Sequence, residues 1–297
     1  MATRRLAWVL NLDADLELAA GPGYEPRKTV RAAMKPHIAQ LTASLVGDDG
    51  LLVDEASPAG SAAGARGRAF CPTPRAIAIL ERAGAEPEPH PPLDVLRRVN
   101  SRAFASALGT TLPGAAFVTE AAVLRRMLRT EPAISATWRV KHAFGMTGRN
   151  QRVIDPATLR EPDLASVEGW MKSGNGVQIE PDVAIDTEYA MHAFIAQDGS
   201  FERGAIVMQR CDARGGWIAT ERVAALPAML GDVAERLVQE IDDVAVALFE
   251  AGYFGPFGID AYTYRDRDGA LAFQPRSEIN ARYSMGFAVG FDRSRLP

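Results

Sequence analysis

The sequence predicts a mixed α/β and α+β fold, in which a small α/β domain precedes a larger α+β domain. Strand and helix signals alternate as far as Pro92, and this alternation is typical of α/β domains. Beyond that point, consecutive strand signals are joined by short turns, including Asp268-Gly269, a dipeptide that favours tight hairpins. Neither a Walker A sequence nor GxGxxG occurs, so a P-loop or dinucleotide-binding enzyme is not indicated. We expect domains over residues 1–98 and 99–297.

The first domain is predicted from hydrophobic periodicity and from turn residues. In order, we expect a strand at 5–10, a helix at 30–45, a strand at 51–53, a flexible loop at 57–68 and a helix at 74–83. Thr73 is a candidate cap for the last helix, because proline suits the first helical turn and Pro74 follows it. Residues 86–92 contain four prolines, so we expect no regular structure there.

The second domain is predicted to contain more strands than helices. We expect helices at 93–108, 120–128, 162–172 and 231–251, and strands at 115–118, 137–143, 151–154, 176–180, 187–196, 205–210, 217–223, 257–264 and 271–280. Several of these strands follow one another without an intervening helix. The pattern therefore predicts antiparallel hairpins rather than a series of βαβ units.

Composition and charge restrict the class of protein. The chain of 297 residues has a net charge of −4 and no long basic run, so its charge does not indicate a nucleic-acid partner. The first apolar segment, residues 6–10, is too short to span a membrane, and no later segment is long enough. The two cysteines, Cys71 and Cys211, are too few for a disulfide framework. We expect a cytoplasmic protein without a membrane partner, and we leave a homodimer open.

Three oxygen-bearing side chains near the end of the chain form a candidate metal site. Glu278 and Asn280 are two residues apart on one predicted strand, so they share a face. The hairpin brings the strand of Asp260 alongside them. Carboxylate and amide oxygens suit Mg²⁺, which commonly binds one or two carboxylates together with substrate phosphates. The alternative is an exposed polar face, against which the apolar neighbours Ile259 and Ile279 argue.

A lysine at the mouth of a glycine-containing turn forms a candidate phosphate site. Lys141 lies on a predicted strand, and the turn that follows contains Gly145, Thr147, Gly148 and Arg149. Glycines let backbone N–H groups approach phosphate oxygens closely, and lysine adds a point charge. The alternative is an ordinary hairpin with a lysine that reaches to solvent.

A strand that ends in Glu180-Pro181 suggests a third candidate site. An irregular segment with Val183 then leads into the strand that carries Glu188. Backbone groups at such a hinge could read an adenine edge, and a carboxylate could accept hydrogen bonds from ribose hydroxyls. The alternative is a linker with solvated acids.

The order of these motifs resembles the ATP-grasp superfamily over residues 99–286. The resemblance implies an N-terminal Rossmann-like preATP-grasp domain followed by an ATP-grasp fold with subdomains at 99–183 and 184–297. Lys141 corresponds to a lysine that contacts the α- and β-phosphates, with Gly145, Thr147, Gly148 and Arg149 in the loop over them. Glu180 and Val183 correspond to the adenine-reading hinge, and Glu188 to the ribose acid.

The same resemblance implies the metal and transfer sites. Asp260, Glu278 and Asn280 correspond to the ligands of Mg²⁺, with two ions expected and Glu278 between them. Arg282 corresponds to a position that handles the transferred phosphate or the acyl group. Arg102 stands where many members carry a further phosphate-binding lysine, and arginine keeps the charge but not the compact ammonium geometry.

The activity implied by the resemblance is that of an ATP- and Mg²⁺-dependent carboxylate–amine ligase. ATP would convert a small-molecule carboxylate into an acylphosphate, which an amine or a similar nucleophile then attacks. Two alternatives stay open: an ATP-grasp kinase that phosphorylates a hydroxyl, and a nucleotide-binding regulatory protein without catalysis.

Overall fold

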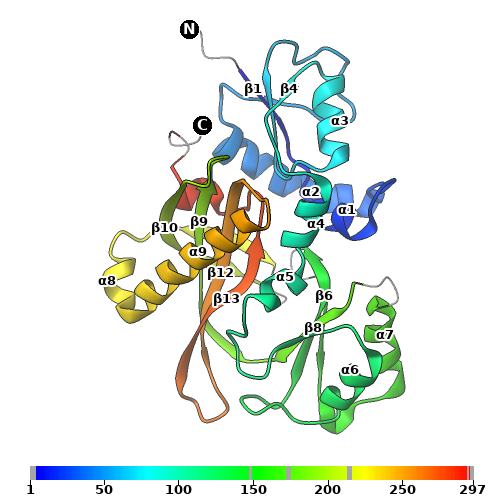
Figure 1. Cartoon of the computed structure of the whole chain (residues 1–297), viewed down its shortest axis with the longest axis vertical. Helices are drawn as coiled ribbons and strands as arrows, with labels where there is room; N and C mark the ends of the chain where they lie inside the picture. Colours follow the sequence, from blue (N-terminus) through cyan, green and yellow to red (C-terminus); the bar gives the residue numbers. More distant parts are fainter. Residues whose placement is uncertain (1–4, 147–148, 172–174, 213–215, 293, 295–297) are drawn as a thin grey trace.

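The computed structural model describes residues 5–146, 149–171, 175–212, 216–292 and 294 (Figure 1). Within these residues, the strands form three sheets, here called the N-terminal, middle and large sheets. The N-terminal sheet is parallel, whereas the other two are antiparallel. The mixed α/β and α+β fold predicted from the sequence is therefore confirmed. Among the described helices, none is long and apolar enough to cross a membrane.

The N-terminal sheet has the strand order β2-β1-β3-β4. Its strands are β1 (Leu6–Val9), β2 (Leu51–Leu52), β3 (Arg66–Ala69) and β4 (Glu86–Pro87), and its helices are α1 (Ala14–Ala20), α2 (Lys28–Leu41), a π-helix (Thr42–Val46) and α3 (Pro74–Arg82). Strand β1 is buried on both faces, with Ala7 and Val9 in one apolar cluster and Trp8 in another. Burial on both faces is expected of a central parallel strand.

Strands β3 and β4 differ from the sequence prediction. Residues 57–68 were expected to be a loop, yet β3 begins at Arg66, and proline-rich residues 86–92 contain the short β4. Strand β4 lies at the edge of the sheet, where the missing N–H of Pro87 costs no ladder hydrogen bond. Glu88 joins the two segments, because its carboxylate accepts hydrogen bonds from Arg66 and Arg68 at 2.6–2.7 Å.

The middle sheet has the strand order β5-β8-β6-β7. Its strands are β5 (Ala116–Val118), β6 (Trp138–Met146), β7 (Arg149–Ile154) and β8 (Val177–Pro181), covered by α6 (Ala121–Leu128) and α7 (Glu161–Met171), with a short 3₁₀ turn (Pro156–Thr158) between β7 and α7. Leu124, Val140 and Val167 belong to the apolar cluster between the helices and the sheet. The opposite face of the sheet is free to line a cavity.

The large sheet has the strand order β11-β10-β9-β12-β13. Its strands are β9 (Ala184–Ile195), β10 (Phe201–Cys211), β11 (Trp217–Glu221), β12 (Gly255–Arg265) and β13 (Leu271–Asn280), with α8 (Leu226–Leu230) and α9 (Asp232–Glu250). Helix α9 lies across one face of this sheet (Figure 1). Ile259 and Ile279 point to that face and pack in the same cluster as Ile241 and Leu248 of α9. Their sequence neighbours Asp260, Glu278 and Asn280 therefore point to the other face.

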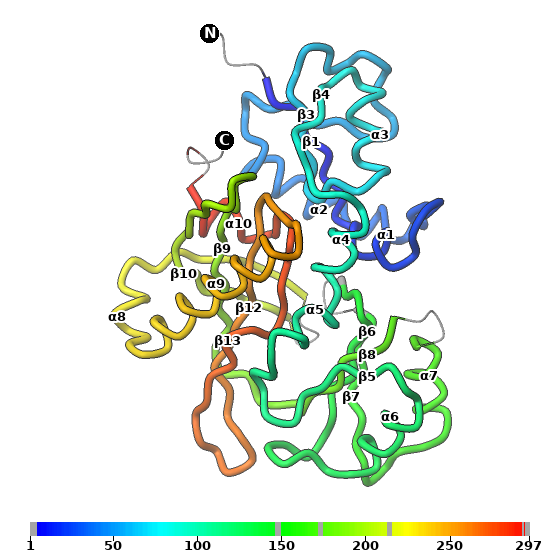
Figure 2. Tube along the Cα trace, in the orientation of Figure 1, coloured from blue at the N-terminus to red at the C-terminus, as the bar shows by residue number. Residues whose placement is uncertain are grey.

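Two helices, rather than the one predicted at 93–108, connect the first sheet to the second. Helix α4 (Leu93–Val99) ends at Asn100, and α5 (Arg102–Ala107) begins after Ser101, whose hydroxyl accepts a hydrogen bond from the N–H of Ala103. Such a cap starts a new helix. At the other end of the chain, α10 (Phe287–Gly290) returns to pack against the π-helix after α2 (Figure 2).

Candidate functional site

A cavity of about 950 Å³ lies between the middle sheet and the large sheet and reaches the N-terminal sheet. The middle sheet contributes Lys141 and Glu180, and the large sheet contributes Glu188 and Asp260. Asp15, which follows β1 in the chain, lines the far end. Most of the residues singled out from the sequence line this cavity: Arg102, Lys141, Gly145, Glu180, Val183, Glu188, Asp260, Glu278, Asn280 and Arg282.

Three of these residues come together on the paired strands β12 and β13. Asp260 and Glu278 are direct cross-strand partners, and the next pair on that face joins Gly258 to Asn280. The Asn280 amide donates a hydrogen bond of 2.9 Å to Asp260 Oδ2. The convergence expected from the hairpin is therefore observed in the structure.

Gln209 is a fourth member of this group that the sequence did not indicate. Its side-chain amide donates a hydrogen bond of 2.6 Å to Asp260 Oδ1. Gln209 lies on β10 opposite Glu188 of β9, and Glu188 is in turn opposite Tyr262 of β12. Only the order of these three strands brings Gln209 to Asp260, and no local pattern in the sequence contains that order.

The carboxyl group of Asp260 is half-buried beside another acid. Burial raises the pKa of Asp260 to about 7, and the negative charge of Glu278 adds to the rise. The hydrogen bonds from Gln209 and Asn280 favour the ionised form and oppose this shift. A cation bound between the two carboxylates would remove the repulsion, and the oxygens of Asp260, Glu278 and Asn280 are donors that fit Mg²⁺.

This group is a partial donor set for a metal ion. Among the described residues, no group of three or more His, Cys, Asp and Glu side chains could hold a metal ion by itself. The site therefore fits a hard cation that arrives with oxygen ligands of its own, such as the phosphate groups of a nucleotide.

Arg102 makes a bridge between the large sheet and the middle sheet. Its Nη2 donates to Glu278 Oε1 at 2.8 Å, and its Nη1 donates to the carbonyl oxygen of His142 at 3.0 Å. The guanidinium lies against Gly145, where an added Cβ would be 2.5 Å from Nη1. A Cβ at this position would therefore require the Arg102 guanidinium to shift.

Lys141 forms an ion pair with Glu180 across β6 and β8. The Lys141 Nζ lies 2.5 Å from Glu180 Oε1, and the Glu180 side chain is 3% exposed. The other carboxylate oxygen accepts a hydrogen bond of 2.9 Å from Gln178. Two residues predicted for separate roles, phosphate binding and base reading, are therefore direct partners in the structure.

The rest of the predicted loop is only partly described. Thr147 and Gly148 lie outside the described residues, and Arg149 begins β7, where its backbone pairs with Met146. Val183 and Glu188 line the cavity between the two sheets.

Arg282 is held by an acid from the other end of the chain. Its Nη2 and Nε donate to the two oxygens of Asp15 at 2.7 and 3.3 Å, and its guanidinium lies 5.4 Å from the centre of the Phe70 ring. Although burial alone would lower the pKa of Arg282, the charge of Asp15 and its hydrogen bonds raise it. Arg282 therefore stays charged at the far end of the cavity. The sequence singled out Arg282 but not Asp15.

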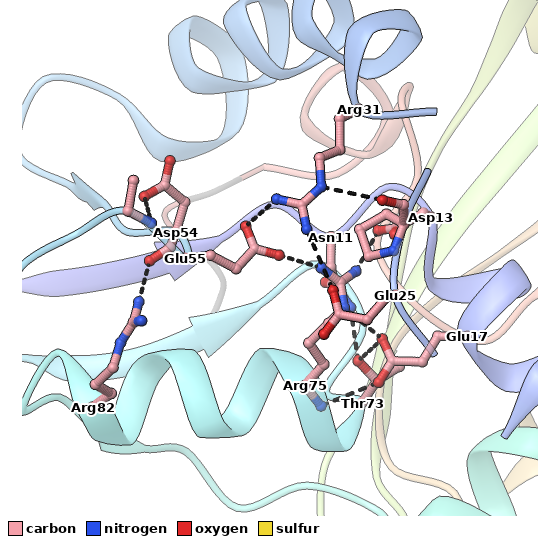
Figure 3. A network of polar contacts seen from close by, with 12 residues as sticks. Asn11, Asp13, Glu17, Glu25, Arg31, Asp54, Glu55, Thr73, Arg75 and Arg82 are labelled. Atoms are coloured by element: carbon pink, nitrogen blue, oxygen red, sulfur yellow. Dashed lines mark hydrogen bonds and ion pairs between the residues drawn. The ribbon is translucent and has the colours of Figure 1, made fainter. Parts of the chain in front are cut away.

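A network of buried polar groups holds α1, and with it Asp15, in place (Figure 3). Arg75 donates to Asp13 at 2.6 Å and to Glu17 at 3.3 Å. Thr73, which was predicted to cap α3, makes no side-chain cap bond, because its hydroxyl donates to Glu17 at 2.8 Å and accepts from Asn11 at 3.0 Å. These contacts join the segment after β1 to the segment after β3.

Apolar and aromatic side chains form the wall beside Arg282. Met34 and His37 of α2 and Trp217 of β11 line this part of the cavity, and the His37 and Trp217 rings meet edge-on with centres 6.2 Å apart. Phe70 and Met285 complete this wall. The cavity therefore has a charged half between the antiparallel sheets and a more apolar half against the N-terminal sheet.

No family model and no curated protein matches the chain, but solved structures do. An N5-carboxyaminoimidazole synthetase from Staphylococcus aureus complexed with ADP is 12% identical with a TM-score of 0.52, and the match covers 96% of this chain and 73% of that one. A biotin carboxylase–β-γ-ATP complex from Campylobacter jejuni is 13% identical with a TM-score of 0.52, covering 98% and 72%. A D-alanyl-alanine synthetase A from Vibrio cholerae is 12% identical with a TM-score of 0.50, covering 95% and 90%.

Proposed function

We propose that this chain, which has the ATP-grasp fold of those enzymes, is an ATP- and Mg²⁺-dependent ligase that activates a small-molecule carboxylate as an acylphosphate for attack by an amine. One observation carries the proposal. Cationic side chains, Lys141 and Arg102, and oxygen-bearing side chains, Asp260, Glu278 and Asn280, come from segments far apart in the chain and line one cavity. The fold by itself does not identify a reaction.

The charged half of the cavity supports a role in binding ATP. Lys141 is positioned to exchange Glu180 for an α- or β-phosphate oxygen, because its ammonium group is partly exposed to the cavity. Val183 and Glu188 would contact the base and the ribose. Asp260, Glu278 and Asn280 would hold Mg²⁺, which neutralises charge on the phosphates during phosphoryl transfer.

The apolar half supports a role in binding the carboxylate and the amine. Arg282 presents a permanent positive charge where a substrate carboxylate or its phosphorylated form would lie. Asp15 keeps that guanidinium oriented from the N-terminal sheet. The wall of Met34, Phe70 and Trp217 shields this end from water, which protects an acylphosphate from hydrolysis. The free cysteines, Cys71 and Cys211, are consistent with the cytoplasmic location expected from the sequence.

The test is a screen for ADP release with ATP, Mg²⁺ and pairs drawn from amino acids, other small acids and amines. We expect turnover with some pairs and its loss in Lys141→Ala and Glu278→Ala. Matched controls are Lys28→Ala at the start of α2 and Glu235→Ala on α9, both exposed. Wild-type turnover in either site variant would contradict the proposal. Mass spectrometry of the products distinguishes a ligated product from a stable phosphorylated one, which would indicate a kinase.

A further inference from the structure

The guanidinium of Arg102 lies beside the candidate metal ligands and is held there from two sides. Nη2 bonds Glu278 on β13, and Nη1 bonds the backbone carbonyl of His142 on β6. Gly145 leaves the space that the guanidinium fills. The side chain is 11% exposed, and its Nε is buried without a hydrogen-bond partner among the described residues. Arg102 is therefore a built-in part of the site rather than a side chain reaching from the surface.

In this position, Arg102 occupies a carboxylate oxygen that a pair of metal ions would need as a ligand. One Glu278 oxygen already accepts from Arg102, and each Asp260 oxygen accepts an amide hydrogen bond, from Gln209 and from Asn280. Asn280 can still turn its amide oxygen toward a cation, and Glu278 keeps its second oxygen. The remaining oxygens suit one cation, while a second at Glu278 would lie next to a permanent positive charge.

We propose that the site takes one divalent cation with its nucleotide, because Arg102 occupies the place beside Glu278 where a second cation would bind. The inference rests on the proposed function, since it presumes that a nucleotide brings the cation. The proposed single ion differs from the two ions that the sequence resemblance implied. In place of the second ion, Arg102 supplies the second positive charge near the phosphates.

The number of manganese ions bound with a non-hydrolysable ATP analogue tests this proposal. Equilibrium dialysis with Mn²⁺, with free Mn²⁺ followed by electron paramagnetic resonance and bound nucleotide measured separately, gives ions per nucleotide-bound chain. We expect one ion in the wild-type protein, one in Arg102→Lys, which keeps the charge, and two in Arg102→Met, which removes it. Arg139→Met is the matched control with one ion expected, because Arg139 lines the cavity but pairs with Asp182.

The outcomes separate the inference from the proposed function. Two ions in the wild-type protein, or none, overturn the inference while nucleotide binding stands. One ion in both the wild-type protein and Arg102→Met also overturns it, because something other than Arg102 then excludes the second ion. Failure of the wild-type protein to bind the ATP analogue would overturn the proposed function itself. If Arg102→Met does not fold, Arg102→Gln, which also removes the charge, takes its place with two ions expected, and one ion in that variant overturns the inference.

Discussion

Asp260 makes the stability of this protein depend on pH in a direction opposite to that of most paired carboxylates. Its pKa rises from 3.8 to about 7 in the folded chain, because the carboxyl is half-buried beside Glu278. The folded state therefore binds this proton more tightly than the unfolded state does. By linkage, the contribution of Asp260 to the free energy of unfolding falls as the pH rises from about 4 to about 7, and it levels off above that.

The magnitude follows from the size of the shift. Each pKa unit corresponds to about 1.4 kcal/mol, so a rise from 3.8 to about 7 corresponds to about 4 kcal/mol for Asp260 between the two limits. Asp260→Asn removes the titrating group. Its stability relative to the wild-type protein should increase by about 1.4 kcal/mol per pH unit over that window. The amide has one acceptor oxygen instead of two, so it loses a hydrogen bond from Gln209 or Asn280, which lowers its stability at every pH.

Urea denaturation of both proteins from pH 4.5 to pH 8.5, followed by tryptophan fluorescence, measures this difference without added metal. Because the other titrating groups are common to the two proteins, the difference between their curves reports Asp260 together with its coupling to Glu278. A difference that is flat within about 1 kcal/mol from pH 5 to pH 7 would refute the reasoning, since a change of about 2 kcal/mol is expected there. A difference that changes in the opposite direction would mean that hydrogen bonding, not burial, dominates.

Two other substitutions test contacts around the cavity. Lys141→Met leaves the carboxylate of Glu180 buried beside Gln178 alone, and loss of one partner of a buried ion pair costs about 3–5 kcal/mol. Urea titration should show this loss of stability in the single variant and its recovery in the double variant Lys141→Met with Glu180→Gln. A loss below about 1 kcal/mol in the single variant would contradict the prediction. Gly145→Ala places a Cβ 2.5 Å from Arg102 Nη1, so overpacking should lower the free energy of unfolding by about 1–3 kcal/mol. This loss should nearly vanish when the substitution is made in the Arg102→Ala variant. Additive effects of the two substitutions would show that the residues do not interact.

Much of the fold was predictable because the signals are local. Alternation along a strand places Ile259 and Ile279 on one face and Asp260, Glu278 and Asn280 on the other, and the structure has this arrangement. The Asp-Gly turn predicted that β12 and β13 pair. A bulge between Asp260 and Tyr262 then shifts the register, so counting from the turn does not place Asp260 opposite Glu278. The short strands β3 and β4 escaped prediction, because each has too few residues to produce a periodic signal.

The sequence by itself determined the order of the longer elements and the common face of Asp260, Glu278 and Asn280 in the hairpin. Tertiary structure alone decided the contacts that complete this site: Gln209 with Asp260, Arg102 with Glu278 and Asp15 with Arg282. The last pair joins residues 267 positions apart. The physical reason is that side-chain direction within a strand or helix follows from backbone geometry, whereas the meeting of distant segments depends on which strand edges pair and which faces bury together.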